Sequence, residues 1–241
     1  MSGPRTSMPE TPTSTRATLH VLAAHLLGRR RFEASGRFGL RACPGGFGTP
    51  AFGAAPEVVR VAGTSLVRET GGESAARPVR GATLRSLADF AGVDLTRPFD
   101  AGPDTPATGD VDATLEVDSD AAAVLADWYE LAWRVLDGVV VGLPPSSAPA
   151  TIQLWPEHFD AGTDVGLASG GRVNLGFSPG DAAEPEPYVY LGPRGPGRPG
   201  PSEYWNAPFG AKLRRSELAP GDRAAACTAF LTAGLDHLSA G

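Results

Sequence analysis

The sequence predicts an α+β protein in which an antiparallel sheet of about five strands has helices packed mainly on one face. Two observations support this class. Segments with the apolar spacing of helices alternate with short runs rich in β-branched and aromatic residues, in the order α-β-β-α-α-β-β-β-α. The last three strand-like runs are joined by short loops, which favours an antiparallel meander.

Four segments carry apolar residues at helical spacing. In residues 16–30 the leucines fall on one face, and Thr15 is expected to cap this helix. Residues 119–138 have the longest apolar stripe in the chain and end at Gly138, a residue type that commonly terminates helices. Two further helices are expected over residues 83–91 and 223–238.

The strand-like runs are short and are bounded by turn residues. Alternating apolar and polar residues predict a strand over residues 37–43, and β-branched residues predict another over residues 57–68. In the second half of the chain we expect strands over residues 151–155, 171–177 and 187–192.

The first fifteen residues contain no apolar run, so we expect a disordered tail over residues 1–15 and a single α+β domain over residues 16–241. Possible sub-halves of this domain are residues 16–142 and 150–241. The longest apolar run is too short to cross a bilayer, and no signal peptide is recognisable. We therefore expect a cytoplasmic protein without a membrane partner.

The formal net charge is −6, and the densest basic cluster, residues 29–31, has no basic stripe to continue it, so nucleic acid is not an expected partner. Cys43 and Cys227 are far apart and lack metal-site spacing, so both are expected to be reduced. Whether either thiol is reactive stays open, as does the oligomeric state. The sequence points to no particular cofactor.

Residues 151–212 differ in composition from the rest of the chain. The chain has a single Ile, a single Lys and only two Asn, and all of them lie here, as Ile152, Lys212, Asn174 and Asn206. Elsewhere the chain is dominated by residue types with GC-rich codons. Retention of the rare types in one segment indicates a functional requirement there.

The string LWPEHFD, residues 154–160, is the centre of this segment. If it is a strand, His158 and Asp160 lie on one face. The pair would bind a divalent metal, with Asp164 or Asp181 as a third ligand, or His158 would act as a general base that another carboxylate orients. Alternatively Trp155 and Phe159 fill the core, His158 bonds a backbone carbonyl and Asp160 caps a turn. No spacing fixes a third ligand, so we assign no metal site.

Aromatic and polar residues gather in the strings that follow. GFSPGD predicts a tight turn that projects Asp181, and EPYVYLGP places Tyr188 and Tyr190 on one strand face. Such aromatic clusters with a few polar groups are typical of small-molecule pockets. The expected catalytic residues are His158, Asp160 and Asp181. The expected ligand-binding residues are Trp155, Asn174, Tyr188, Tyr190, Trp205 and Asn206.

The strings TLHVLAAHLL, GFGTPAFG, TLRSLADFAGV, LWPEHFD, SPGD, EPYVYLGP and WNAPFGA resemble those of a group of actinobacterial proteins with no established activity. The resemblance implies a shared fold and a high-GC bacterial origin. We expect a protein that binds a small molecule around LWPEHFD and WNAPFGA. The alternatives are a non-catalytic structural or protein-interaction domain, and a metal-dependent enzyme that uses His158 and Asp160.

Overall fold

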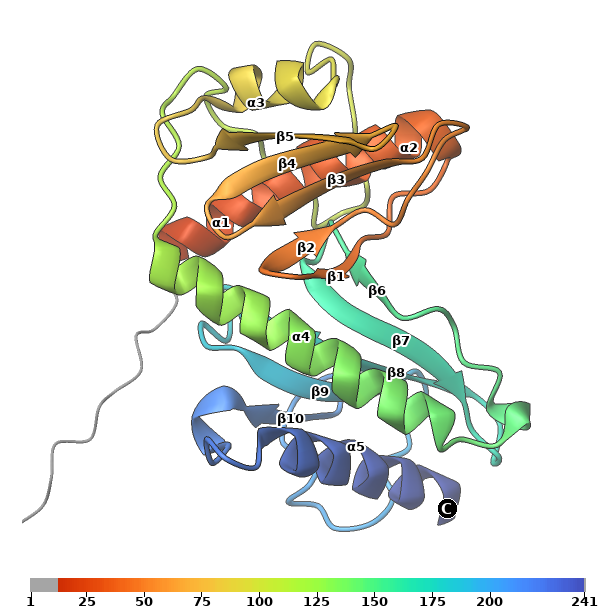
Figure 1. Cartoon of the computed structure of the whole chain (residues 1–241). Helices are drawn as coiled ribbons and strands as arrows, with labels where there is room; N and C mark the ends of the chain where they lie inside the picture. The colour runs from red at the N-terminus through yellow and green to blue at the C-terminus, as the bar shows by residue number, and fades with distance from the viewer. Residues whose placement is uncertain (1–12, 241) are drawn as a thin grey trace, which may run out of the picture.

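A computed structural model describes residues 13–240 and confirms the α+β class. Its strands form two antiparallel sheets of five strands each, and in both sheets the strands are adjacent in the order of the chain (Figure 1). The sequence predicted one such sheet, because it missed four strands and predicted two others as a single strand. Residues 1–12 of the predicted tail lie outside the described residues.

The first sheet consists of β1 (Arg41–Cys43), β2 (Gly46–Gly48), β3 (Glu57–Ala62), β4 (Ser65–Thr70) and β5 (Glu73–Pro78). The predicted strand over residues 57–68 is in fact a hairpin. Ala62 pairs with Ser65, and Gly63 takes the positive φ that this two-residue turn requires.

The second sheet consists of β6 (Gln153–Trp155), β7 (Asp160–Gly166), β8 (Arg172–Ser178), β9 (Tyr188–Pro193) and β10 (Ala211–Arg214). Buried apolar residues alternate along β7, β8 and β9 and form one face of this sheet. The opposite face carries the residues between them, which are glycines, tyrosines and polar side chains. The two faces therefore have different roles.

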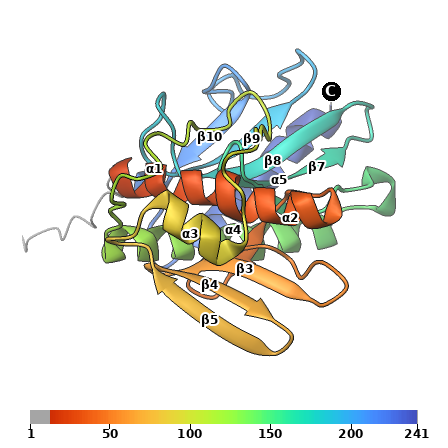
Figure 2. The ribbon, with the colours of Figure 1, turned by 90° about the horizontal axis from the view of Figure 1, so that it is seen from above.

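The first helix is longer than predicted. α1 (Thr13–Leu22), the π-helical segment η1 (Ala23–Gly28) and α2 (Arg29–Ser35) follow one another without a break (Figure 2). Thr15 is not its cap. This residue is buried inside α1, where its hydroxyl oxygen accepts the backbone N–H of Asp118 at 2.9 Å.

The other predicted helices are present. They are α3 (Leu84–Ala91), α4 (Ser119–Val141) and α5 (Arg223–Ala240). Asp118 caps α4, because its carboxylate accepts the N–H groups of Asp120 and Ala121. Within residues 13–240 no helix is both long and apolar enough to cross a membrane.

Helix α4 runs between the two sheets and joins their cores (Figure 1). Tyr129 of α4 packs edge-to-face against Phe47 of β2 and against Phe159, with ring centroids 5.9 and 5.6 Å apart. Trp128 donates its indole N–H to the backbone oxygen of Ser178 in β8 at 2.8 Å. Helix α5 packs beside α4 on the same apolar face of the second sheet, so these two helices leave the polar face of that sheet uncovered.

Candidate functional site

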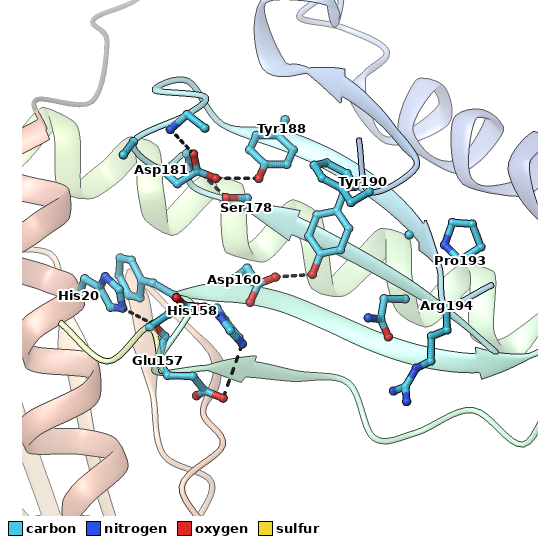
Figure 3. A pocket seen from close by; sticks show the side chains of 18 of the residues that line it. His20, Glu157, His158, Asp160, Ser178, Asp181, Tyr188, Tyr190, Pro193 and Arg194 are labelled. Carbon is cyan, nitrogen blue, oxygen red and sulfur yellow. Dashed lines mark hydrogen bonds and ion pairs between the residues drawn. The ribbon is translucent and has the colours of Figure 1, made fainter. Parts of the chain in front are cut away.

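A cleft of about 1190 Å³ opens on the polar face of the second sheet. One wall is α1, which contributes Arg16 and His20. The floor comes from β7, β8 and β9, and the rim comes from the Gly- and Pro-rich segment after β9, with Arg194 and Arg198 (Figure 3). The lining thus combines α1 and Asp104 with the second sheet and its loops, which lie far apart in the sequence.

The LWPEHFD string forms a hairpin at one end of the cleft and is not a continuous strand. Trp155 of β6 pairs with Asp160 of β7, and Phe159 closes the turn by donating its N–H to the oxygen of Trp155 at 2.7 Å. Phe159 has φ +59°, an unfavourable conformation for a bulky residue. Its buried ring and a 2.7 Å hydrogen bond from the Tyr129 hydroxyl to its carbonyl hold it there. The turn presents Glu157 and His158 to the cleft.

His158 is half-exposed and faces two carboxylates. Its Nδ1 lies 3.0 Å from Oδ2 of Asp104, and its Nε2 lies 4.0 Å from Oε1 of Glu157. It therefore does not bond a backbone carbonyl, as one of the alternatives expected. His20 does so instead, since its Nε2 lies 3.0 Å from the oxygen of Glu157, and burial lowers the pKa of His20.

Asp160 and Glu157 are the most unusual groups of the cleft. Oδ2 of Asp160 accepts the hydroxyl of Tyr190, whereas Oδ1 of Asp160 and Oε2 of Glu157 are buried without a hydrogen-bond partner among the described residues. Burial raises the pKa of both carboxyl groups. Asp160 is thus held by Tyr190 and does not cap a turn.

A glycine floor allows Tyr190 to reach Asp160. Tyr190 of β9 is paired with Gly176 of β8, which in turn is paired with Gly162 of β7. The Tyr190 ring lies directly over Gly176, so that a Cβ added there would overlap the ring. Glycine at this position is required for the hydrogen bond between Tyr190 and Asp160.

Asp181 lines the cleft, but its carboxylate is already bonded. Oδ1 accepts the N–H groups of Ala183 and Glu184 at 2.7 and 2.8 Å, and Oδ2 accepts the Tyr188 hydroxyl at 2.9 Å. Burial by itself raises the pKa of Asp181, but these hydrogen bonds outweigh it and the net pKa is lowered. Asp181 fixes the turn between β8 and β9, which leaves it little capacity for catalysis.

An aromatic wall stands beside the carboxylates. Tyr188 and Tyr190 share one face of β9, as predicted, with ring centroids 6.1 Å apart. Phe209 stacks on Tyr188 at 6.4 Å and remains 43% exposed at the mouth of the cleft. Asn174 of β8 also lines the cleft. These side chains offer apolar and π surface to a ligand.

Three expected ligand-binding residues do not line the cleft. Trp155 packs edge-to-face against Phe38 at 6.2 Å, and Trp205 donates its indole N–H to the oxygen of Pro199 at 2.9 Å. Asn206 forms two hydrogen bonds of 2.9 Å with the backbone of Lys212 and so shapes the entry to β10. All three have structural roles where the structure places them.

Sequence reasoning missed Asp104, and it assigned no role to Glu157 or Phe209, although both lie in the strings that it considered. Glu157 could have been found from the sequence, because it lies within the LWPEHFD string. Asp104 lies in the Pro-rich segment before α4, more than fifty residues from His158, and nothing in the sequence joins the two.

No three His, Cys, Asp or Glu side chains of residues 13–240 are grouped so that they could hold a metal ion. Asp164, one expected third ligand, is instead paired with Arg172 and lies 2.9 Å from Arg194. Cys43 and Cys227 are free thiols, and burial raises the pKa of both.

The fold and the cleft define a class: an α+β protein with two antiparallel meanders joined by one helix, and a polar cleft on the second meander. No family model, curated protein or solved structure matches the chain. The resemblance to actinobacterial proteins therefore stays a prediction.

Proposed function

We propose that this protein binds a small organic molecule in the cleft on the polar face of the second sheet. One observation carries the proposal: in a cleft of about 1190 Å³, Glu157 and Asp160 each have a buried carboxyl oxygen without a hydrogen-bond partner among residues 13–240. Buried polar groups in folded proteins are nearly always hydrogen-bonded. Exceptions that line a cleft are candidates for contact with a ligand.

A purely structural domain accounts for only part of this region. Asp181, Asn206 and Trp155 have the packing and turn roles that such a domain would need. Such roles do not explain Glu157 and Asp160, because one buried carboxyl oxygen of each has no partner among the described residues. Leaving such an oxygen unpaired costs about 1–3 kcal/mol of stability. This loss of stability is explained if the two carboxyl groups bind a ligand.

The test is a thermal-shift screen of metabolites, repeated on two matched variants. Phe209→Ala removes the exposed ring at the mouth of the cleft, and Phe32→Ala removes an equally exposed ring on α2 (43% and 44% exposed). A ligand at a hundred times its Kd stabilises the protein by about 2.7 kcal/mol. We expect hits whose shift is reduced by Phe209→Ala and unchanged by Phe32→Ala. If neither variant alters any shift, or nothing binds, the proposal is wrong.

General-base catalysis is a second candidate, favoured by the 3.0 Å contact between His158 Nδ1 and Asp104 Oδ2. A carboxylate at Nδ1 fixes the tautomer in which Nε2 is free to accept a proton. The test is mass spectrometry of a cleft ligand after incubation with the protein and with His158→Gln. Conversion by the wild type alone supports catalysis, and recovery of unchanged ligand from the wild type rejects it.

A cytoplasmic location stays a prediction from the sequence.

A further inference from the structure

The end of the cleft formed by the β6–β7 hairpin is acidic. Asp104 and Glu157 lie at the two ring nitrogens of His158, and Asp160 lines the same cleft. The side chain of Glu157 is only 8% exposed, and its Oε2 has no partner among the described residues. Gly102 lies against Glu157 and covers it from the loop side, since a Cβ at Gly102 would lie 3.3 Å from its Cγ. We call Asp104, Glu157 and Asp160 the acidic end.

The arginines that line the cleft are engaged elsewhere. Arg16 donates to the carbonyl oxygens of Pro185 at 2.8 Å and Asp181 at 3.4 Å. Arg194 pairs with Asp164. Arg198 donates to backbone oxygens of its own loop and of Phe209. None of these three guanidinium groups forms an ion pair with Glu157 or Asp160, so the arginines that line the cleft leave the charge of the acidic end unbalanced.

A bound cation would change the energetics of this end. A buried carboxylate without a partner is destabilised by the loss of water, and an opposite charge within about 4–6 Å favours its ionised form. The raised pKa values of Glu157 and Asp160 have desolvation as their largest cause. Binding of a cation would therefore lower both pKa values and release protons.

We propose that the ligand of the cleft carries an ammonium or guanidinium group, which binds at the acidic end, and an apolar or aromatic body, which lies along Tyr188, Tyr190 and Phe209. The inference rests on the proposed function and specifies its ligand class. Aromatic faces attract cations and also pack against apolar groups, so the wall suits both parts of such a ligand.

Three probes of similar shape separate charge from shape: phenethylamine, 2-phenylethanol and phenylacetate. They are compared by ligand-observed NMR and by calorimetry at neutral pH. We expect phenethylamine to bind at least about tenfold more tightly than the neutral and anionic probes, a difference of about 1.4 kcal/mol. Tighter binding of either other probe, or no binding of phenethylamine, overturns the inference.

Proton release gives a second readout. Titrations of phenethylamine in two buffers of different ionisation enthalpy should show net release of protons, increasing as the pH is lowered from about 7 to about 5. His158, His20, Asp104 and Tyr190 also face these carboxyl groups, so the assignment needs variants. The release should decrease in Glu157→Gln. Binding without any proton release would contradict a cation at these carboxyl groups.

Isosteric variants locate the charge. Glu157→Gln and Asp160→Asn should each weaken phenethylamine binding at least about tenfold. Glu130→Gln, on the exposed surface of α4, is the matched control and should leave binding unchanged. Circular dichroism verifies that each variant folds. If Asp160→Asn does not fold, Glu157→Gln alone provides the test. Equal binding by the variants and the wild type overturns the inference.

The outcomes also separate the inference from the proposed function. If a neutral or anionic compound binds and Phe209→Ala weakens it, the cleft binds ligands but the inference about charge is wrong. If no probe binds and the metabolite screen also finds nothing, both proposals are wrong.

Discussion

Two glutamates with the same burial show how the two sheets differ. Glu57 opens β3 in the first sheet and Glu157 lies at the hairpin of the second, and each is 6% exposed. Glu57 accepts hydrogen bonds from Arg30 at 2.7 and 3.0 Å and from Arg68 at 3.1 Å. Oε2 of Glu157 accepts none from the described part of the chain. The first sheet thus neutralises its buried acid internally, and the second does not.

The pKa values of the two glutamates move in opposite directions for this reason. Burial alone raises the pKa of Glu57, but the two arginines outweigh it and lower the pKa overall. Burial raises the pKa of Glu157, and nothing of comparable strength opposes it. One residue type at one degree of burial therefore stabilises the fold in one place and weakens it in the other. The difference identifies Glu157 as the buried acid whose carboxyl group the described residues leave unbalanced.

The largest expected effect is on the first sheet. Glu57→Gln leaves Arg30 and Arg68 without their counter-charge, and we expect a loss of about 2–3 kcal/mol in the free energy of unfolding, measured with urea at pH 7. Because the pKa of Glu57 is lowered by folding, its stabilisation is present above the ordinary value of about 4.3 and is lost as the pH falls below it. The gap between variant and wild type should therefore close in acid. A loss that persists unchanged in acid would refute the ion-pair explanation.

The second expected effect breaks the hydrogen bond that holds Asp160. Gly176→Ala places a methyl group in the space of the Tyr190 ring, so we expect a loss of about 2 kcal/mol by the same measurement. Gly192→Ala is the control. It lies on the same face in β9, and its added Cβ would make an ordinary contact of 3.6 Å with the oxygen of Phe209. Equal losses in both variants would show that the glycine floor has no special role.

The third prediction is a change in the free energy of unfolding with the opposite sign to that expected for Glu57→Gln. Glu157→Gln should not destabilise the protein at pH 7 and should raise the free energy of unfolding by about 1 kcal/mol, because an unpaired buried charge is removed. Folding raises the pKa of Glu157, so the folded state binds more protons than the unfolded state above about 4.3, and its contribution to stability falls as the pH rises. The advantage of the variant should therefore increase from pH 4 to pH 7. If Glu157→Gln instead lowers the free energy of unfolding at pH 7, Glu157 stabilises the fold as Glu57 does, and the proposed difference between them is wrong.

Much of the fold was predictable, because the helices have strong local signals. The apolar stripe of α4 extends over several turns, and its capping Asp118 precedes it directly. The missed strands lack such signals. Every residue of β5 is exposed, so it has no alternating pattern, and β2 contains two glycines in three residues. The sheet count was wrong for that reason.

The candidate site was predictable in position but not in geometry. Period-two reading placed His158 and Asp160 on one strand, whereas the chain reverses between Trp155 and Asp160. A tight turn is usually recognisable in a sequence because Gly or Asn occupies the position with positive φ. Here Phe159 occupies that position, held by core contacts that come from α4 and cannot be read locally. Asp104 was missed for the same physical reason, since its contact with His158 is long-range.

The smallest expected effects distinguish Asn174, which lies in β8, from Asn206, which lies in the loop before β10. The composition alone treated these two residues alike. Asn206→Ala removes two hydrogen bonds to the backbone of Lys212 at an exposed position, so we expect a loss of about 1 kcal/mol and unchanged ligand binding. Asn174→Ala should change stability by less than about 0.5 kcal/mol, because the residue is exposed, and should weaken cleft binding. Urea denaturation and calorimetry on the same two variants measure both quantities. If Asn206→Ala also weakens binding, the cleft extends to the loop before β10, and the proposed distinction between a structural Asn206 and a ligand-binding Asn174 is wrong.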